Sequence, residues 1–272
     1  MAKNRLDNLM ITRGMAPSRE KARAMILAGE VKVNGLRVDK PGANFNEEVD
    51  ITVESSGPRY VSRGGLKLEK AIADFNIDFA GNVVLDVGAS TGGYTDCALQ
   101  HGAVKVFALD VGYGQLDWNL RNDPRVVCLE RTNIRYFQPE QLGGQVDIIT
   151  IDVSFISTTL VFPVVKHMLK SDGHIISLIK PQFEAGRNKV GKKGVVRDPD
   201  VHREVLINCI TSAAKEGLFC TGITYSPITG PQGNIEFFIR LNKEQLSPEL
   251  EIEKTVALVV SEAHRQLGGK GI

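Results

Sequence analysis

Four charged residues, distant in the sequence, stand where a parallel sheet would bring them to one edge. Lys67 lies near the start of a helix-length segment, Asp152 and Lys180 end apolar runs, and Glu236 begins another. The unperturbed pKa of a lysine is about 10.4, but partial burial and a neighbouring ammonium group lower it toward working pH. We therefore predict a catalytic site in which Lys180 positions and deprotonates a hydroxyl and Lys67 modulates it. The two carboxylates are expected to orient the lysines and the hydroxyl.

A glycine-rich turn after the first apolar run is the second candidate for chemistry. A dinucleotide fingerprint would have glycine at positions 88, 90 and 93, but position 90 is Ser. Asp86 would repel a pyrophosphate and suits the amino group of a methionine, while Asp110 ends the next run and can bind ribose hydroxyls. A tight turn that caps a packed helix would explain the glycines but would leave both aspartates without a role. We expect a nucleoside-type cofactor to bind at Asp86, Gly88, Ala89, Ser90, Thr91, Gly92, Gly93 and Asp110.

The pattern from residue 63 onward predicts the sheet that must position these side chains. Short apolar runs alternate with helix-length segments at 91–100 and 158–170, which is typical of a parallel sheet covered on both faces. The last two runs are separated by a turn-rich loop and predict an antiparallel edge, followed by a helix at about 249–267. Trp118 is expected to be packed. The predicted strands are 83–87, 104–110, 126–129, 146–152, 174–180, 219–225 and 235–241.

Residues 1–60 predict a separate, small α+β domain. We expect one helix at 5–12 and a second that begins after Ser18 as N-cap and ends at Gly29. Asn and Gly at 34–35 are a strong hairpin signal between strands at 31–33 and 36–38, and a further strand is expected at 51–53. A Ser-Ser-Gly-Pro stretch places a linker at about 55–62, so that the second domain covers 63–272.

Basic residues are unevenly distributed, although the formal net charge of the 272 residues is only +1. Residues 1–40 hold nine lysines and arginines against four acidic residues, and residues 181–197 hold five against one. Such clusters can bind phosphate backbones, and a solvated surface is an equally simple explanation for either. The segment 183–198, which contains three glycines, predicts a mobile loop beside Lys180 that could close over phosphates. Disorder without function is the alternative.

The N-terminal segment resembles the S-four type of RNA-binding domain. The resemblance rests on Arg-Leu-Asp at 5–7, Ser-Arg-x-x-Ala at 18–22, Gly-x-Val-x-Val-Asn-Gly at 29–35 and Lys-Pro at 40–41. It implies that the second helix and the hairpin present basic side chains to folded RNA, whereas a helical packing unit with incidental charge is the alternative. In this domain and the other basic segments, the expected RNA contacts are Arg5, Arg13, Arg19, Lys21, Arg23, Lys32, Arg63, Lys189, Lys192 and Lys193.

The second domain resembles the FtsJ-like ribose methyltransferases, because the order Lys67, Asp152, Lys180, Glu236 matches their Lys-Asp-Lys-Glu tetrad. With the preceding domain, the chain resembles the TlyA family of RNA 2′-O-methyltransferases, which are also called haemolysins. Its most specific segments are Ser-Arg-Gly-Gly-Leu-Lys at 62–67, Asp-Val-Gly-Ala-Ser-Thr-Gly-Gly at 86–93 and Lys-Pro-Gln-Phe-Glu at 180–184. The resemblance implies an α/β, Rossmann-like class I methyltransferase with a mostly parallel seven-stranded sheet. It also implies S-adenosyl-L-methionine as cofactor and ribosomal RNA or ribosomal subunits as partners.

Three other functions remain open. A non-catalytic RNA-binding ribosome assembly factor would keep the basic residues but would not need the four charged site residues. A base-amine methyltransferase commonly has an Asn/Asp-Pro-Pro-Tyr/Phe turn, whereas this chain has Asp-Val-Ser-Phe at 152–155. A haemolysin acting directly on membranes is least expected, because no apolar run reaches the roughly 18 residues that span a bilayer.

The cysteines and the N-terminal residues indicate the cellular compartment. Cys97, Cys128, Cys209 and Cys220 lie far apart, so we expect free thiols and neither a disulfide framework nor a metal site. The first residues lack the apolar segment of a secretory signal peptide. We therefore expect a cytoplasmic protein.

Overall fold

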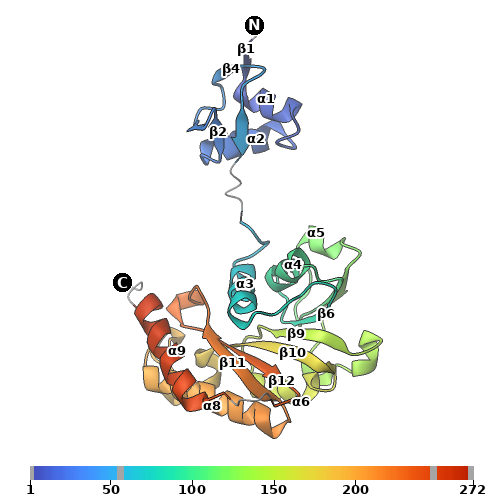
Figure 1. Cartoon of the computed structure of the whole chain (residues 1–272), viewed down its shortest axis with the longest axis vertical. Helices are drawn as coiled ribbons and strands as arrows, with labels where there is room; N and C mark the ends of the chain where they lie inside the picture. Colours follow the sequence, from blue (N-terminus) through green and yellow to red (C-terminus); the bar gives the residue numbers. More distant parts are fainter. Residues whose placement is uncertain (1–2, 54–57, 246–249, 269–272) are drawn as a thin grey trace. The chain divides into compact units, whose positions relative to one another are not determined.

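A computed structural model describes residues 3–53, 58–245 and 250–268. The chain divides into two units, residues 1–59 and 60–272 (Figure 1). The expected linker at 55–62 lies partly outside the described residues, because 54–57 are not among them. Each unit is therefore described by itself.

The N-terminal unit packs two helices against short strands. Its core consists of apolar side chains from α1, α2, β2 and β5, among them Leu6, Ile26 and Val31, all fully buried. Helix α2 begins after Ser18, whose hydroxyl accepts a hydrogen bond from the backbone N–H of Lys21, so the predicted N-cap is confirmed. The elements are β1 (Lys3–Arg5), α1 (Leu6–Thr12), α2 (Arg19–Leu27), β2 (Val31–Val33), β3 (Leu36–Arg37), β4 (Asn44–Asn46) and β5 (Ile51–Val53).

The strands of this unit form two small sheets. The predicted hairpin is confirmed, since β2 pairs with β3 on one side and with β5 on the other, both antiparallel. Strands β1 and β4 form a second, two-stranded sheet that the sequence did not predict. Because Arg5 belongs to β1, the first helix begins one residue later than expected.

The second unit is built on a seven-stranded sheet in the order β11-β12-β10-β9-β6-β7-β8. Strand β12 runs antiparallel to both of its neighbours, and the remaining pairs are parallel, so the predicted mostly parallel sheet with an antiparallel edge is confirmed. The chain order reverses at β6, between β7 and β9, where an open α/β sheet binds its ligand. The strands are β6 (Val83–Val87), β7 (Lys105–Leu109), β8 (Val126–Leu129), β9 (Val146–Ile151), β10 (Leu169–Ile179), β11 (Phe219–Tyr225) and β12 (Phe237–Asn242).

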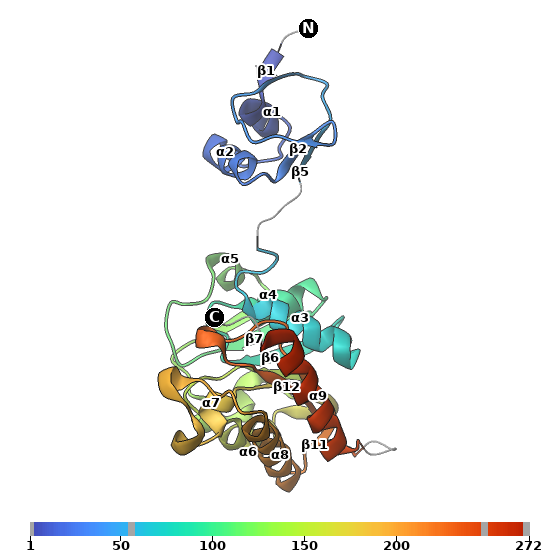
Figure 2. The ribbon, with the colours of Figure 1, turned by 90° about the vertical axis from the view of Figure 1, so that its left-hand side faces the viewer.

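Helices cover both faces of this sheet (Figures 1 and 2). One face packs against α3, α4 and α5, and the other packs against α6, α8 and α9. The α-helices are α3 (Gly64–Phe75), α4 (Gly93–Gln100), α5 (Trp118–Arg121), α6 (Phe162–Val165), α7 (Pro181–Glu184), α8 (Pro199–Lys215) and α9 (Ile252–Leu267). The 3₁₀ helices are η1 (Ile134–Tyr136), η2 (Pro139–Leu142), η3 (Thr158–Leu160), η4 (Arg187–Lys189), η5 (Lys192–Gly194) and η6 (Pro231–Gly233).

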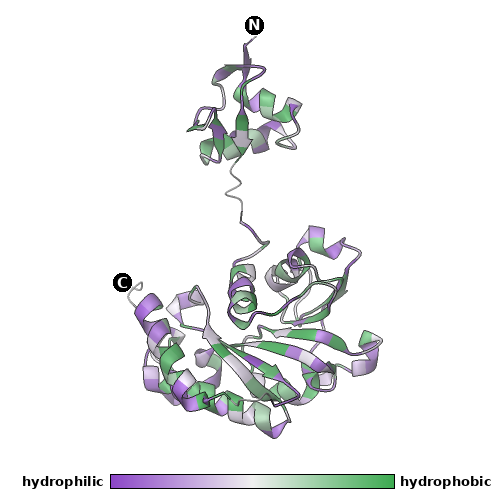
Figure 3. Ribbon diagram, viewed as in Figure 1, coloured by the Kyte–Doolittle hydropathy of each residue, from purple (hydrophilic) through white to green (hydrophobic). Residues whose placement is uncertain are grey.

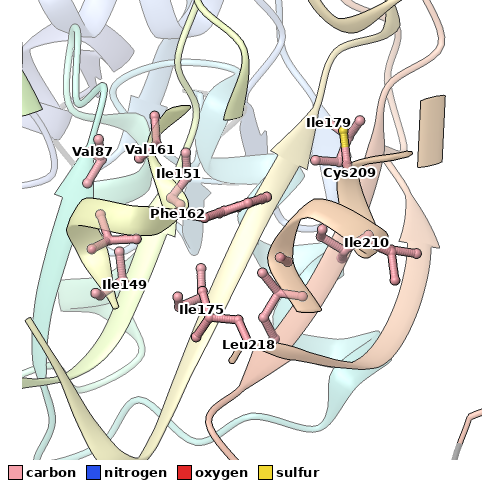
Figure 4. Packing of buried hydrophobic residues seen from close by; sticks show 14 of the residues in the cluster. Val87, Ile149, Ile151, Val161, Phe162, Ile175, Ile179, Cys209, Ile210 and Leu218 are labelled. Atoms are coloured by element: carbon pink, nitrogen blue, oxygen red, sulfur yellow. The ribbon is translucent and has the colours of Figure 1, made fainter. Parts of the chain in front are cut away.

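Burial in the core explains why the central strands occur in the sequence as apolar runs. Strand β9 and residues 175–179 of β10 are buried and mostly hydrophobic (Figure 3), whereas residues 170–174 of β10 are polar or glycine. Ile149 and Ile175 from these strands lie among side chains of the covering helices, including Phe162 of α6 and Ile210 of α8 (Figure 4). This packing holds the carboxyl ends of β6, β9 and β10 in fixed register, which the site requires.

Several predicted elements need correction. The helix expected at 158–170 is broken into η3 and α6, and the chain already joins the sheet at Leu169, which pairs with Val146. Strand β10 is therefore longer than expected. Trp118 is 74% exposed and is not packed. Glu236 precedes β12 instead of beginning it. Residue 249, the expected start of the last helix, lies outside the described residues, and α9 begins at Ile252.

Candidate active site

A cavity of about 670 Å³ opens at the carboxyl edge of the sheet, a size suited to a small-molecule site. Its wall includes the turn that follows β6, the N-terminal end of α3 and the loops that follow β9 and β10. All four residues of the predicted tetrad line it: Lys67, Asp152, Lys180 and Glu236. Asp152 and Lys180 each follow directly on a strand, as the parallel topology predicts.

The tetrad forms two ion pairs. Lys67 Nζ lies 2.6 Å from Glu236 Oε2, and Lys180 Nζ lies 2.5 Å from Asp152 Oδ1. Lys180 Nζ also donates a hydrogen bond to Ser154 Oγ at 3.0 Å. The exposed fractions of both lysines are only 9%, and that of Glu236 is 1%. Each ammonium therefore contacts a carboxylate, an arrangement that fixes the direction of the amine but differs from the expected modulation of one lysine by the other.

Besides Asp152 Oδ1, whose contact with Lys180 is an ion pair, three buried polar atoms of the cavity wall have no hydrogen-bond partner among the described residues. They are Glu236 Oε1, Gln182 Oε1 and the Tyr94 hydroxyl. Burial and the nearby charges of Asp152 and Glu236 raise the pKa of Tyr94 well above its usual value, so its hydroxyl remains a donor. Because buried polar groups are rarely left unpaired in proteins, these atoms are suited to a ligand that brings both donors and acceptors.

A second cavity, of about 460 Å³, lies at the ends of β6 and β7. Gly88, Ser90, Asp152, Ser154 and Phe155 line both cavities, so the two share a wall. Gly88 has φ +90°, and a Cβ there would lie 2.5 Å from the carbonyl oxygen of Asp152, so no larger residue fits. The backbone can therefore come close to a ligand at this turn.

Asp110 lies in the second cavity but is already bonded to the backbone. Its carboxylate accepts hydrogen bonds from the N–H of Ser90 at 2.8 Å and from that of Gly112 at 2.7 Å. The side chain thus ties the end of β7 to the turn after β6. Carboxylate oxygens accept more than one hydrogen bond, so this arrangement leaves capacity for ribose hydroxyls.

Asp86 and Gly92 are placed differently from the prediction, because neither lines a cavity. The carboxylate of Asp86 is 1% exposed and accepts hydrogen bonds from Thr95 Oγ1 at 2.7 Å and Thr150 Oγ1 at 3.0 Å. Burial raises the pKa of Asp86 to about 7, against the opposing effect of these two donors. Asp86 therefore stabilises the turn from the interior of the domain, away from the cavities. Ala89, Ser90, Thr91 and Gly93 do line the first cavity, together with Gly88.

Sequence reasoning missed several residues of the two cavities. Phe155 is 90% exposed, has φ +64° and lies with its ring centroid 5.0 Å from that of Phe183. Gln182 belongs to the Lys-Pro-Gln-Phe-Glu motif, but no role was predicted for it from the sequence. Their position in the loops that follow β9 and β10 is the signal that could have identified them, since Asp152 and Lys180 begin these loops. Among the others are Gln115, Thr132, Asn133, Ser154 and Asn234.

Three of the predicted RNA contacts take part in the internal structure of the N-terminal unit. Arg5 and Arg19 both contact the buried carboxylate of Asp7, at 2.8 and 3.2 Å. Hydrogen bonding to Arg5 is the main cause that lowers the pKa of Asp7 to about 2. Arg13 donates to the carbonyl oxygens of Val49 and Glu47. By contrast, Lys21 and Arg23 are exposed, and Lys32 is half-buried.

Of the residues predicted to contact RNA in the second unit, Arg63 lines the first cavity, and the others belong to the segment 183–198. Arg63 is exposed at its rim, and Lys193 is exposed on the segment 183–198. Lys189 forms an ion pair with Glu204, while the side chain of Lys192 lies outside the described residues. This segment is held to the body of the domain, because the Asn234 side chain bonds the backbone of Gly194 and Val196.

Comparisons with known proteins agree with this geometry. Residues 60–243 match the FtsJ-like methyltransferase family model, and residues 4–51 match the S4 domain. A Bacillus subtilis protein provisionally named as the rRNA methyltransferase YqxC is 50% identical over 98% of this chain and 96% of its own. The 16S/23S rRNA (cytidine-2′-O)-methyltransferase TlyA of Mycobacterium tuberculosis is 44% identical over 88% and 90%. The chain belongs to the TlyA family.

A solved structure from Streptococcus thermophilus, described as a hemolysin, also matches this TlyA-family chain. It is 42% identical, has a TM-score of 0.75, and the match covers 98% of each chain. The resemblance predicted from the sequence is thereby confirmed, and S-adenosyl-L-methionine is the cofactor of this methyltransferase fold. Within the described residues, no helix has both the length and the apolar character needed to cross a membrane.

Proposed function

We propose that this TlyA-family chain transfers a methyl group from S-adenosyl-L-methionine to a ribose 2′-hydroxyl of ribosomal RNA in the cytoplasm. Residues 1–60 would bind the RNA, and residues 63–272 would hold the cofactor and perform the transfer. The observation that carries the proposal is the pair of buried ion pairs, Lys67–Glu236 and Lys180–Asp152, on the wall of one cavity. That wall is shared with a second cavity suited to a nucleoside.

The second cavity offers what an adenosyl group needs. Asp110 would accept hydrogen bonds from ribose hydroxyls, and the backbone at Gly88 and Ser90 would approach the ligand closely. Gln115 and Asn133 offer side-chain amides at the same cavity. When bound, the cofactor supplies a methyl group that is already electrophilic, so the protein's task lies with the acceptor hydroxyl.

Lys180 is the residue we propose to hold and deprotonate that hydroxyl. Asp152 Oδ1 and Ser154 Oγ fix the direction of Lys180 Nζ, which accepts the hydroxyl proton when the amine is neutral. Glu236 Oε2 is paired with Lys67, and Glu236 Oε1 is unpartnered among the described residues, so it can accept a hydrogen bond from the incoming ribose. The four side chains thus align the hydroxyl and receive its proton.

The proposed substrate class rests on the two-domain composition and on exposed basic residues. Lys21 and Arg23 of the S4 domain are exposed, as is Arg63 at the rim of the first cavity, and all three can contact phosphates. The relative from Mycobacterium tuberculosis is named for cytidine in 16S and 23S rRNA. We propose that the substrate of this chain is ribosomal RNA assembled in a ribosomal subunit, and we specify no nucleotide.

The test uses labelled S-adenosyl-L-methionine and separately purified small and large ribosomal subunits. Transfer of the label shows whether one subunit or both are methylated. Digestion to nucleosides and mass spectrometry then locate the methyl group. The proposal expects a 2′-O-methyl nucleoside at a defined position. A methylated base, or cofactor binding with no transfer to either subunit, would contradict it and would favour a base methyltransferase or an assembly factor.

A further inference from the structure

The motif Lys-Pro-Gln-Phe-Glu at 180–184 ends in a carboxylate that the proposed chemistry does not use. Lys180, Gln182 and Phe183 line the first cavity, but Glu184 lines neither cavity. Its carboxylate instead contacts the neighbouring loop, which follows β9. Glu184 Oε2 accepts a hydrogen bond from Ser157 Oγ at 2.5 Å, and Glu184 Oε1 accepts from Thr158 N–H at 2.8 Å and Thr158 Oγ1 at 3.0 Å.

The loop 153–157, which precedes Thr158, is stabilised by few hydrogen bonds of its own backbone amides. The N–H of Asp152 donates to the carbonyl oxygen of Val87 at 2.9 Å, and the next amide with an acceptor is that of Thr158. Between them, none of the amides of 153–157 donates to a residue in the described parts of the chain. Phe155 in this stretch has φ +64°, a conformation that β-carbon-bearing residues seldom adopt without external support.

Two side chains four residues apart therefore hold the loop at its two ends. Where the loop begins, Lys180 forms an ion pair with Asp152 and donates a hydrogen bond to Ser154. Where it ends, Glu184 accepts hydrogen bonds from Ser157 and Thr158. Between these attachments the Phe183 ring contacts the Phe155 ring, with centroids 5.0 Å apart. Helix α7 fixes the spacing between Lys180 and Glu184, because Phe183 N–H donates to the carbonyl oxygen of Lys180.

We propose that Glu184 is a positioning residue that fastens the loop 153–157 to α7 and so sets Asp152 and Ser154 against Lys180. The inference deepens the proposed function and rests on it for its kinetic consequence. The same loop forms the wall common to both cavities, through Ser154 and Phe155. A displacement of about 1 Å in such a wall is enough to reduce turnover strongly.

The role is geometric, and it is distinguishable from a purely electrostatic one. Glu184→Gln removes the charge but keeps an oxygen that can accept from the Thr158 amide and an NH₂ group that can donate to Ser157. Glu184→Ala removes every contact. If Glu184 positions the loop, Gln rescues most of the turnover that Ala loses. If its charge is what matters, the two variants are equally impaired.

The experiment compares the full-length wild type with Glu184→Ala, Glu184→Gln and the control Glu216→Ala. Glu216 is a partly buried carboxylate in an ion pair with Lys166, at 2.6 Å, and lines neither cavity. Hydrogen exchange of the segment 158–165 is measured without substrate, alongside kcat and KM for methyl transfer to ribosomal subunits. The exchange reports on the attachment of Thr158, at the end of the loop, to Glu184, so it tests the inference even if the proposed substrate is wrong.

We expect Glu184→Ala to exchange faster in 158–165 and to lose about tenfold or more in kcat, with KM for the cofactor changed less than about threefold. Glu184→Gln and Glu216→Ala should stay near the wild type in both measurements. Unchanged exchange in Glu184→Ala, or a kcat loss that Gln does not rescue, would overturn the inference. A wild type without turnover on any subunit would overturn the proposed function instead, and the exchange would then decide this inference alone.

Discussion

The basic residues of the two units differ in what surrounds them. In the first cavity, Lys67 and Lys180 are 9% exposed and each contacts a carboxylate. In the S4 domain, the side chains of Arg5 and Arg19 are 43% and 53% exposed, although both reach the buried Asp7. Buried pairs require accurate geometry to offset the loss of hydration, whereas exposed pairs contribute little. The cavity therefore holds its charges at fixed, buried positions, whereas the two arginines of the S4 domain remain partly in water.

We expect the largest effect from removing Glu236, because Lys67 then stays buried without its carboxylate partner. Because breaking a buried pair strands one charge, we expect Glu236→Ala to lower the free energy of unfolding by about 3 kcal/mol. Turnover should fall by about a hundredfold or more, since the hydroxyl loses an orienting group. Urea denaturation and steady-state kinetics measure the two effects.

The control is Glu251→Ala, which removes the carboxylate of an exposed pair with Lys254, both side chains 69% exposed. An exposed pair is worth at most about 1 kcal/mol, so stability and turnover should hardly change. Equal losses in the two variants would show that burial is not what distinguishes the cavity.

The two units should also lose stability in different pH ranges. Burial in the second unit lowers the pKa of His202 to about 4, and a hydrogen bond between ring nitrogens joins it to His264 at 2.9 Å. The unfolded chain therefore protonates His202 first, and the contribution of His202 to stability falls by about 3 kcal/mol as the pH drops from about 6.5 to 4. Buried Asp86, whose pKa is raised to about 7, acts in the opposite direction, so the loss is taken as the difference between the wild type and His202→Gln. Hydrogen exchange of the second unit at pH 7 and pH 4.5 measures this loss. A His202→Gln variant with the same pH dependence would contradict the assignment.

The S4 domain should respond only at lower pH. Because the folded-state pKa of Asp7 is about 2 and its unfolded value is near 3.8, the stability it contributes is present above pH 4 and lost toward pH 2. We expect Asp7→Asn to cost about 1 kcal/mol at pH 7, a value reduced for the exposure of its arginine partners. The difference from the wild type should vanish near pH 2 in exchange measurements on this domain. A constant difference at all pH values would contradict it.

The smallest expected effect concerns the exposed bases of the S4 domain. Replacing both Lys21 and Arg23 by Ala should weaken RNA binding about tenfold at low salt and reduce the slope of log affinity against log salt by about 2. Domain stability should not change, because both side chains are exposed. Filter binding at several salt concentrations tests this, with Lys215→Ala on α8 as the control. An unchanged slope would show that these residues do not contact phosphates.

The sheet and the location of the tetrad could be predicted because both follow from topology. A strand buried on both faces is a continuous apolar run, and the residue after it lies at the carboxyl edge, as Asp152 and Lys180 do. The three-residue strands β1 and β4 gave no such signal, because their sequences are mostly polar. The helix expected at 158–170 was wrong because its apolar residues extend up to Leu169, which already pairs with Val146 in the sheet.

The pairing within the site could not be predicted, because it depends on side chains that meet only in the folded chain. Lys67 and Glu236 are 169 residues apart in the sequence. Asp86 looked like a cofactor ligand, but Thr95 and Thr150 draw its carboxylate into the interior. Phe155 and Trp118 are exposed, against the usual preference of aromatic residues for the core.

The most direct test of the account is the Lys180→Ala variant. The experiment measures cofactor-product binding by calorimetry and 2′-O-methyl nucleosides by mass spectrometry, on the subunit that the wild type modifies. We expect the variant to bind S-adenosylhomocysteine within about threefold of the wild type, because the nucleoside cavity does not include Lys180. It should form no 2′-O-methyl product. A variant that still methylates the ribose at the wild-type rate would contradict the central claim.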